Sequence, residues 1–258
     1  MNSPNAPRRR AGGRTLEVLL IVAFAGVAAW LFTSERLTPE LAALQTRYGP
    51  SRNSLGPEEW IIRDFFGDRR GGVFLDVGAS HYRNHSNTYY LETALGWSGI
   101  AVEPLQTFAS DYAQHRPRTK FRPFFVSDVS QEQAKLYFLR ENAGVTSANK
   151  AFTDRYGKGA QEISATTITL NDLLTAEGVE ALDFMNMDIE LSEPKALAGF
   201  DIKKYHPDLV GIEAHPEVRQ QILDYFALNG YVVVGRYLRA DYNNLWFTPL
   251  PDPSAARK

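Results

Sequence analysis

The stretch from Val73 to Pro104 constrains the fold more than any other part of the chain. Its first apolar run, residues 73–77, is typical of a buried parallel strand. Gly78 follows directly and lets backbone amides approach a ligand at the start of the next helix. A second apolar run ends at Glu103, whose carboxylate can accept hydrogen bonds from both hydroxyls of a ribose. The stretch therefore predicts a nucleotide-binding βαβ unit.

Strand-like apolar runs and helical segments alternate from Val73 onward. This alternation predicts a doubly wound, mainly parallel α/β sheet with helices on its faces. We expect strands near residues 73–77, 99–103, 121–127, 182–189, 207–213, 231–238 and 244–248, and helices near 87–95, 105–115, 193–200 and 216–229. No helix separates the last two strands, so we expect an antiparallel hairpin at one end of the sheet.

Composition limits the classes of function. Of the 258 residues, 44% are hydrophobic, which suits one globular domain with a sizeable core plus an appendage. The formal charge is −2, and lysine and arginine are scattered beyond the N-terminus, so no nucleic-acid partner is expected. Cysteine is absent, which excludes disulfides and thiolate metal sites.

An apolar, uncharged segment over residues 18–34 follows a cluster of arginines that ends at Arg14. Its length is at the short end of the range of about 17 to 25 residues for a membrane-spanning helix. The basic flank favours a cytoplasmic N-terminus, so we expect a single-pass membrane protein. A cleaved signal peptide, with small residues at 23–25 and 27–29, and a buried helix of a soluble domain are the alternatives.

Turn residues and shifts in composition divide the chain further. The predicted parts are a basic tail of cytoplasmic type (1–15), a transmembrane anchor (16–34), a linker (35–57), the α/β domain (58–250) and a second tail (251–258). Within the domain, the polar segment 140–161 has several glycines and no clear periodicity. A segment of this kind is a lid, a substrate surface or simply disordered.

Several motifs appear in the order found in one known family. They are FLDVGA at 74–79, SNTYYLE at 86–92, GWSGIAVEP at 96–104, TITLNDLL at 167–174, DFMNMDIE at 183–190 and LVGIE at 209–213. Together they resemble the FkbM-type family of methyltransferases, which use S-adenosyl-L-methionine (SAM), over residues from about 60 to 249. The resemblance implies a Rossmann-like class I methyltransferase fold with an antiparallel C-terminal hairpin.

The resemblance also implies roles for individual residues in binding SAM. Gly78 and Ala79 would form the turn under the methionine part of the cofactor, and Glu103 would bind the ribose. Asp76, at the end of the first strand, would hold the cofactor's amino group directly or through water; a helix-capping role is the alternative.

Ser127 and Asp128 end the third expected strand. They match the place where such enzymes usually meet the adenine ring, although Asp128 is equally well explained as a turn residue.

Methyl transfer to a hydroxyl also needs a base that takes the proton of the acceptor. Four candidates lie at the carboxyl ends of the fourth and fifth expected strands: Asp188, Glu190, Glu213 and His215. The carboxyl ends of parallel strands border the ligand crevice. His215 is a candidate for the base; its alternative is a residue without chemical role at a helix start. The first, second and last of these residues could instead bind a divalent metal ion.

Two departures from the family pattern keep another reading open. Ser80-His81-Tyr82 stands where relatives have a tight glycine turn, and Glu190-Leu191-Ser192 replaces a Glu-Gly-Ala run. A catalytically degenerate member that acts as a binding or trafficking module is therefore the alternative to an enzyme. The absence of a Gly-x-Gly-x-x-Gly motif disfavours a nicotinamide-dependent oxidoreductase.

These features predict a membrane-anchored, SAM-dependent methyltransferase. Its expected acceptor is a sugar or another hydroxylated small molecule, with glycans and glycolipids included. The basic N-terminus would place the domain outside the cytoplasm, whereas SAM is held mainly in the cytosol, so the side of the membrane stays open.

Overall fold

The computed structural model describes residues 38–251, and residues 39–251 form one compact unit. A seven-stranded sheet forms its centre, in the order β10-β11-β9-β8-β1-β2-β3. Its strands are β1 (Val73–Val77), β2 (Ser98–Val102), β3 (Thr119–Arg122), β8 (Phe184–Met187), β9 (Leu209–Glu213), β10 (Tyr231–Val233) and β11 (Asn244–Pro249). Strand β11 is antiparallel to both its neighbours, and the other pairings are parallel.

Successive residues of the central strands face opposite sides of this sheet, as the two-residue period of a strand requires. Leu75 is level with Ile100 and Met185, and all three belong to one hydrophobic cluster. Phe74 and Phe184, one position earlier, belong to a second cluster. Both faces of the sheet are therefore buried, which explains why its strands are continuous apolar runs.

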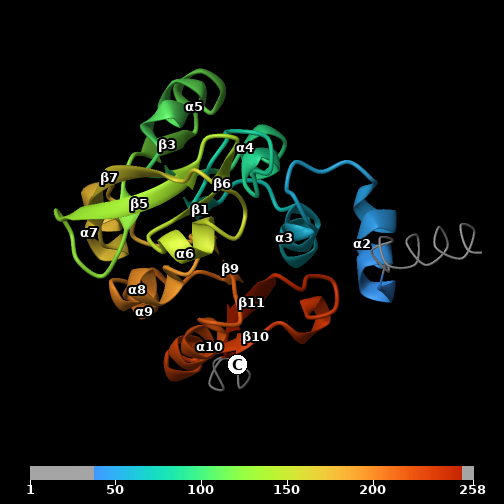
Figure 1. Ribbon diagram of the computed structural model, residues 1–258. Coiled ribbons are helices and arrows are strands. Elements are labelled where there is room, and N and C mark those ends of the chain that lie inside the picture. The colour runs from blue at the N-terminus through green and yellow to red at the C-terminus, as the bar shows by residue number, and fades with distance from the viewer. Residues whose placement is uncertain (1–37, 252–258) are drawn as a thin grey trace, which may run out of the picture. The chain divides into compact units, whose positions relative to one another are not determined.

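Helices cover both faces. The first cluster includes residues of α7 (Leu170–Ala176), α8 (Glu193–Ala198), α9 (Ile202–Tyr205) and α10 (Arg219–Leu228). The second includes residues of α2 (Pro39–Tyr48), α3 (Glu58–Phe66) and α4 (Tyr89–Thr93). Helix α5 (Ala109–His115) and the short 3-10 turns η1 (Gln106–Phe108) and η2 (Gly235–Tyr237) complete the connections. Figure 1 shows this arrangement.

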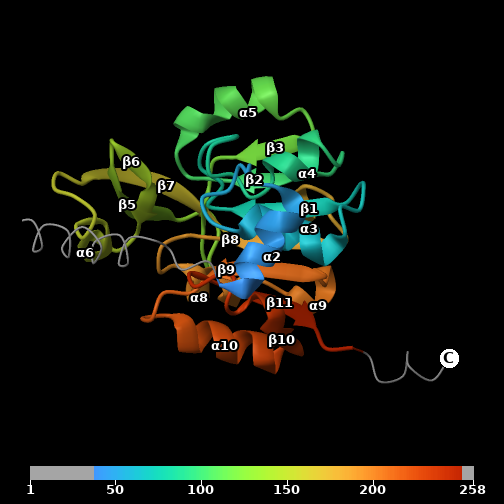
Figure 2. The same cartoon turned by 90° about the vertical axis from the view of Figure 1, so that its right-hand side faces the viewer.

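A second, four-stranded sheet follows the order β4-β7-β5-β6. It comprises β4 (Phe125–Val126), β5 (Gln133–Leu139), β6 (Asn142–Ser147) and β7 (Gln161–Ile168), and α6 (Lys150–Thr153) lies between β6 and β7 in the sequence. Figure 2 shows β5, β6 and β7 set to one side of the main sheet. The segment predicted as a lid, a substrate surface or disorder, 140–161, is thus β6, α6 and the start of β7.

The expected third strand, 121–127, is also divided. Its first part belongs to β3 of the main sheet, and its last part to β4 of the second sheet. Phe124 donates its backbone N–H to the carbonyl of Arg122, which marks the break in the strand. The apolar run alone gave no sign that the chain changes sheets here.

The fold prediction is wrong in its membrane-spanning part. None of the helices within residues 38–251 is long and apolar enough to cross a membrane, and the predicted single-pass membrane location is corrected accordingly. Helices α2 and α10 have ten residues each, about 15 Å at 1.5 Å per residue, roughly half the thickness of a bilayer's hydrocarbon core. The predicted anchor segment itself, 16–34, lies outside the described residues.

Candidate active site

The carboxyl ends of β1, β2, β8 and β9 border a cavity of about 530 Å³. Residues of β5 and β6 in the second sheet, Leu136 and 142–146, line its other side. Six carboxylic acids contribute to the lining, and no lysine or arginine does so among the described residues: Glu58, Asp76, Glu103, Asp188, Glu190 and Glu213. The cavity lies where ligands of open α/β sheets bind, and it is acidic.

Gly78 allows two strands to approach closely at the floor of this cavity. Its φ is +82°, and its N–H donates to the carbonyl of Val102 at 2.9 Å. A Cβ atom at this position would lie 1.8 Å from the carbonyl oxygen of Asp188. No side chain fits there, so only glycine lets the turn after β1 pack against the backbone that follows β8. Ala79, the next residue, also lines the cavity.

Glu103 lies one residue beyond the end of β2, on the cavity wall. Its two carboxylate oxygens accept hydrogen bonds from the backbone N–H groups of Ser80, at 3.2 Å, and Leu105, at 3.0 Å. Burial raises its pKa to about 7, although these hydrogen bonds favour the charged form. The carboxylate is thus fixed in position at the strand end.

Asp76 is buried and fully engaged by side chains around it. Thr88 Oγ1 donates to Oδ2 at 2.8 Å, and Asn186 Nδ2 donates to Oδ1 at 3.0 Å. Asn87 Nδ2 in turn donates to Asn186 Oδ1 at 3.1 Å. Burial raises the pKa of Asp76. The Asp76 carboxylate therefore ties the loop after β1 to strand β8.

Ser127 and Asp128 are placed differently from the other predicted cofactor residues. Neither is among the residues that line the cavity. Ser127 Oγ donates to Asp128 Oδ1 at 3.0 Å, and both follow β4 of the second sheet rather than β3. The structure thus brings together Asp76, Gly78, Ala79 and Glu103 at the cavity but not this pair.

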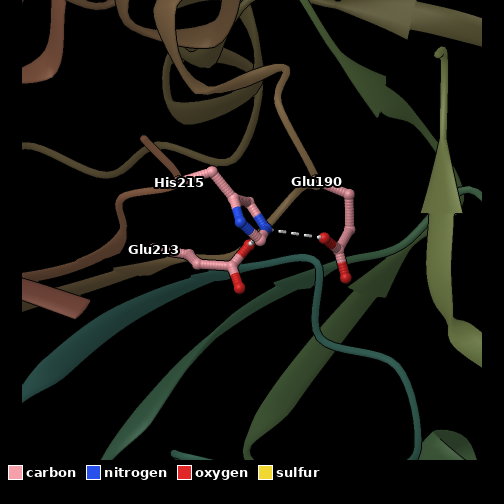
Figure 3. A group of neighbouring side chains, drawn as sticks. All are labelled: Glu190, Glu213 and His215. Atoms are coloured by element: carbon pink, nitrogen blue, oxygen red, sulfur yellow. Dashed lines mark hydrogen bonds and ion pairs between the residues drawn. The ribbon is translucent and has the colours of Figure 1, made fainter. Parts of the chain in front are cut away.

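The four predicted catalytic residues do converge, after β8 and β9. His215 Nε2 lies 3.2 Å from Glu190 Oε2 and 2.9 Å from Glu213 Oε2, as Figure 3 shows. Asp188 is solvent-accessible and lines the cavity together with Glu190 and Glu213, whereas His215 does not line it. His215 therefore contacts both glutamates without lining the cavity.

A family model described as "Methyltransferase FkbM domain" matches residues 76–233, more than half of the chain. The chain belongs to the FkbM methyltransferase family. The resemblance inferred from the motifs is thereby confirmed, and the protein is a methyltransferase whose methyl donor is SAM. Family membership also implies a small-molecule acceptor.

Other comparisons add less. A search of curated proteins gives no match. Solved structures with a similar chain include a TehB-like SAM-dependent methyltransferase from Corynebacterium glutamicum, with 13% identity, 80% of this chain and 92% of that chain covered, and a TM-score of 0.44. An O-methyltransferase from Bacillus cereus in complex with SAH has 13% identity, coverage of 85% and 96%, and a TM-score of 0.40. Similarity at this level does not bear on the acceptor.

In this FkbM methyltransferase, burial raises the pKa values of the carboxylic acids at the site. Burial, and next the charges of Asp188 and Glu190, raise the pKa of Glu213 to about 11. Burial and the charge of Asp188 raise the pKa of Glu190 to about 8. Burial raises the pKa of Asp188 to about 6, although its side chain reaches the cavity. Burial lowers the pKa of His215, which favours the neutral imidazole.

A buried arginine contacts the altered loop of this FkbM methyltransferase, Ser80-His81-Tyr82. Ser80 has a φ of +47°, and the Tyr82 ring stacks at 4.6 Å on His81 and on His115. Arg116, which is 1% exposed, donates to the carbonyl of Tyr82 at 2.8 Å and pairs with a buried carboxylate, Glu92. These contacts fix the conformation of the loop, and the sequence alone did not reveal them.

Contacts with the second sheet were also missed. Ser147 Oγ, at the end of β6, donates to the carbonyl of Glu190 at 2.6 Å. The buried ring of Phe152 in α6 meets the His215 ring edge-on, with centroids 5.0 Å apart. Glu190 and Leu191 adopt positive φ angles of +55° and +76°, which non-glycine residues rarely do. The second sheet thus fixes a strained loop beside the predicted catalytic residues.

Proposed function

We propose that this protein methylates a hydroxyl group of a small, polyhydroxylated acceptor such as a sugar. The observation that carries the proposal is that Asp188, Glu190 and Glu213 line the same cavity as the glycine turn and Glu103. This arrangement supplies groups for cofactor binding and groups for handling a proton within the same cavity.

The residues present fit the cofactor. The glycine turn of Gly78 and Ala79 lines the cavity and would hold the methionine part. Glu103, whose carboxylate accepts hydrogen bonds from two backbone N–H groups, would accept the ribose hydroxyls. Asp76 positions Asn186 and Thr88. When bound, SAM supplies an already electrophilic methyl group, so positioning provides most of the acceleration.

The adenine role of Ser127 and Asp128 is still a prediction. A modest movement of the loop after β4 would be needed for either side chain to enter the cavity, since neither lines it. We therefore assign cofactor binding to the four predicted residues that line the cavity: Asp76, Gly78, Ala79 and Glu103.

We propose that Asp188 takes the acceptor's proton and that His215 acts as a positioning residue. Asp188 lines the cavity and is accessible, as a base must be, whereas His215 contacts Glu190 and Glu213 without lining it. A proton leaving the acceptor hydroxyl would move to a carboxylate oxygen of Asp188. The hydroxyl oxygen would take the methyl group as the bond from that carbon to the sulfonium sulfur breaks, which leaves a neutral thioether.

The acceptor class rests on the neutral polar lining. Amide and hydroxyl side chains at the cavity, including Asn142, Thr146, Asn243 and Asn244, both donate and accept hydrogen bonds. Such groups suit a ligand with several hydroxyls, and a glycan or glycolipid would provide them. Family membership alone does not distinguish these from other hydroxylated small molecules.

The test is calorimetric titration of S-adenosylhomocysteine into the full chain, followed by methyl-transfer assays with SAM and a panel of sugars. We expect stoichiometric binding that Glu103→Ala weakens about tenfold to a hundredfold, because a charge-assisted hydrogen bond contributes about 1.5–3 kcal/mol. Glu132→Ala, at an exposed position, is the matched control. A folded chain that binds neither compound would instead support the binding or trafficking module.

A further inference from the structure

The side chains of Glu190, Glu213 and His215 form a three-ligand cluster beside the cavity. One oxygen of each carboxylate and a ring nitrogen of His215 all lie within 4.8 Å of one another. Figure 3 shows the two carboxylates pointing toward the same edge of the imidazole. The three groups come from the loop after β8 and from the end of β9, so the main sheet itself brings them together.

Hydrogen bonding alone does not account for this convergence. His215 Nε2 lies 3.2 Å from one glutamate and 2.9 Å from the other, but a single ring N–H points in one direction. Oε2 of Glu213 has no hydrogen-bond partner among the described residues. Two ligands at right angles around a cation, each about 2.1 Å away, are separated by about 3 Å. The observed separations match that geometry.

Nearby buried carboxylates add a second, independent indication of a cation. Glu193 is fully buried, and its Oε2 has no hydrogen-bond partner in the described structure. Its charge acts on both Glu190 and Glu213. Glu58, which is 8% exposed and lines the same cavity, also has an unpartnered Oε2. The other oxygen of each, Oε1, accepts a hydrogen bond, from the N–H of Ile189 and from Asn244 Nδ2 respectively. A buried carboxylate oxygen that lacks a partner is costly unless a positive charge offsets it.

We propose that Glu190, Glu213 and His215 bind a divalent cation of the Mn²⁺ type. Carboxylate oxygens suit such hard cations, and one imidazole is compatible with Mn²⁺ and later first-row metals. Glu190 and Glu213 line the cavity whereas His215 does not, so the remaining coordination positions of the cation would be open to the acceptor on the cavity side. A hydroxyl oxygen of the acceptor would occupy one of them.

Strand β6 and helix α6 contact two of the three ligands. Ser147 Oγ holds the backbone carbonyl of Glu190, and the ring of Phe152 packs against His215. Supporting contacts of this kind orient metal ligands and commonly affect metal affinity about tenfold to a hundredfold. The acceptor-orienting role of the cation rests on the proposed function, whereas cation binding does not.

The test is a titration of the full chain with Mn²⁺, after dialysis against a chelator, followed by electron paramagnetic resonance. We expect one bound Mn²⁺ per chain and, in pulsed spectra, the coupling of an imidazole nitrogen. Glu190→Gln, Glu213→Gln and His215→Ala should each lower the Mn²⁺ affinity about tenfold or more, and His215→Ala should remove the nitrogen coupling. Glu217→Gln, an exposed carboxylate paired with Arg155, should bind as the natural chain does.

The inference is overturned by a folded chain that does not bind Mn²⁺, by bound Mn²⁺ without nitrogen coupling, or by affinities that the three substitutions leave unchanged. The spectrum of the natural chain decides the matter even where a variant does not fold. Methyl transfer without Mn²⁺ binding would overturn this inference and leave the proposed function intact. Mn²⁺ binding with no S-adenosylhomocysteine binding would do the reverse.

Discussion

At the scale of single residues, the absence of a side chain at Gly78 matters both for the fold and for the cofactor site. Its positive φ is one requirement, and the missing side chain is a second, because the backbone of Asp188 occupies the place of a Cβ. The two requirements can be separated by experiment, since other glycines of the chain have the first without the second.

Gly78→Ala should lower the free energy of unfolding by roughly 2–5 kcal/mol. Alanine disfavours the left-handed conformation, and its Cβ would collide with the backbone of Asp188, directly after strand β8. The substitution should also abolish S-adenosylhomocysteine binding. Chemical denaturation and calorimetry measure the two effects. Gly178→Ala is the control, because Gly178 has a φ of +69° and open space around it. Equal losses in the two variants would show that the close approach is unimportant.

Asp188 and His215 have different proposed roles, which kinetics can distinguish. Asp188→Asn should lower kcat about a hundredfold or more, the usual contribution of a general base, with KM for SAM little changed. Asp224→Asn, at an exposed position in α10, should leave kcat unchanged. A small effect at Asp188 together with complete loss in His215→Ala would assign the base to the histidine.

Some of these residues could be found from the sequence and others could not. Gly78 and Glu103 stand at the ends of strongly apolar runs, and strand ends in a parallel sheet determine position well. Ser127 and Asp128 also follow an apolar run, but that run crosses from one sheet to the other. Glu58 and Arg116 reach the site region only through tertiary contacts, which no local pattern records.

At the scale of secondary-structure elements, the second sheet determines how the loop after β8 is held. Its strands were missed because β5, β6 and β7 alternate between exposed and partly buried positions. A half-solvated antiparallel sheet produces a weak hydrophobic pattern. The buried strands of the main sheet give continuous apolar runs, and the ranges predicted for them contain β1, β8, β9 and β10.

Ser147→Ala should lower kcat about fivefold while leaving S-adenosylhomocysteine affinity unchanged. The substitution removes the hydrogen bond to the carbonyl of Glu190, a loss of about 1 kcal/mol, and frees a loop with positive φ angles. Steady-state kinetics with the identified acceptor measures the effect. Ser164→Ala, on the exposed side of β7, is the matched control, and a loss of equal size there would contradict a specific role for β6.

At the scale of the whole molecule, the acidic cavity makes stability depend on pH in an unusual direction. Burial raises the pKa of Glu58 and of Glu103 to about 7. Between the ordinary glutamate pKa and this value, the folded chain holds more protons than the unfolded chain. The contribution of these groups to stability is therefore complete at low pH and is lost as the pH rises through about 7.

We expect the free energy of unfolding to be higher at about pH 5.5 than at about pH 8.5, by on the order of 2 kcal/mol. Urea denaturation at the two pH values measures the difference. Glu103→Gln should reduce it, because the amide does not ionise. Stability that increases steadily over this interval would show that the two carboxyl groups titrate normally in the folded chain.

The six carboxylic acids around the cavity also affect how substrate and product exchange there. SAM carries a positive sulfonium, and the molecule left after transfer has a neutral sulfur in its place. Those carboxylates that are ionised attract the first more strongly than the second, so we expect each methyl transfer to remove an electrostatic attraction that had held the cofactor. The same lining that admits the donor therefore helps to release the spent cofactor, and turnover is coupled to the disappearance of one charge.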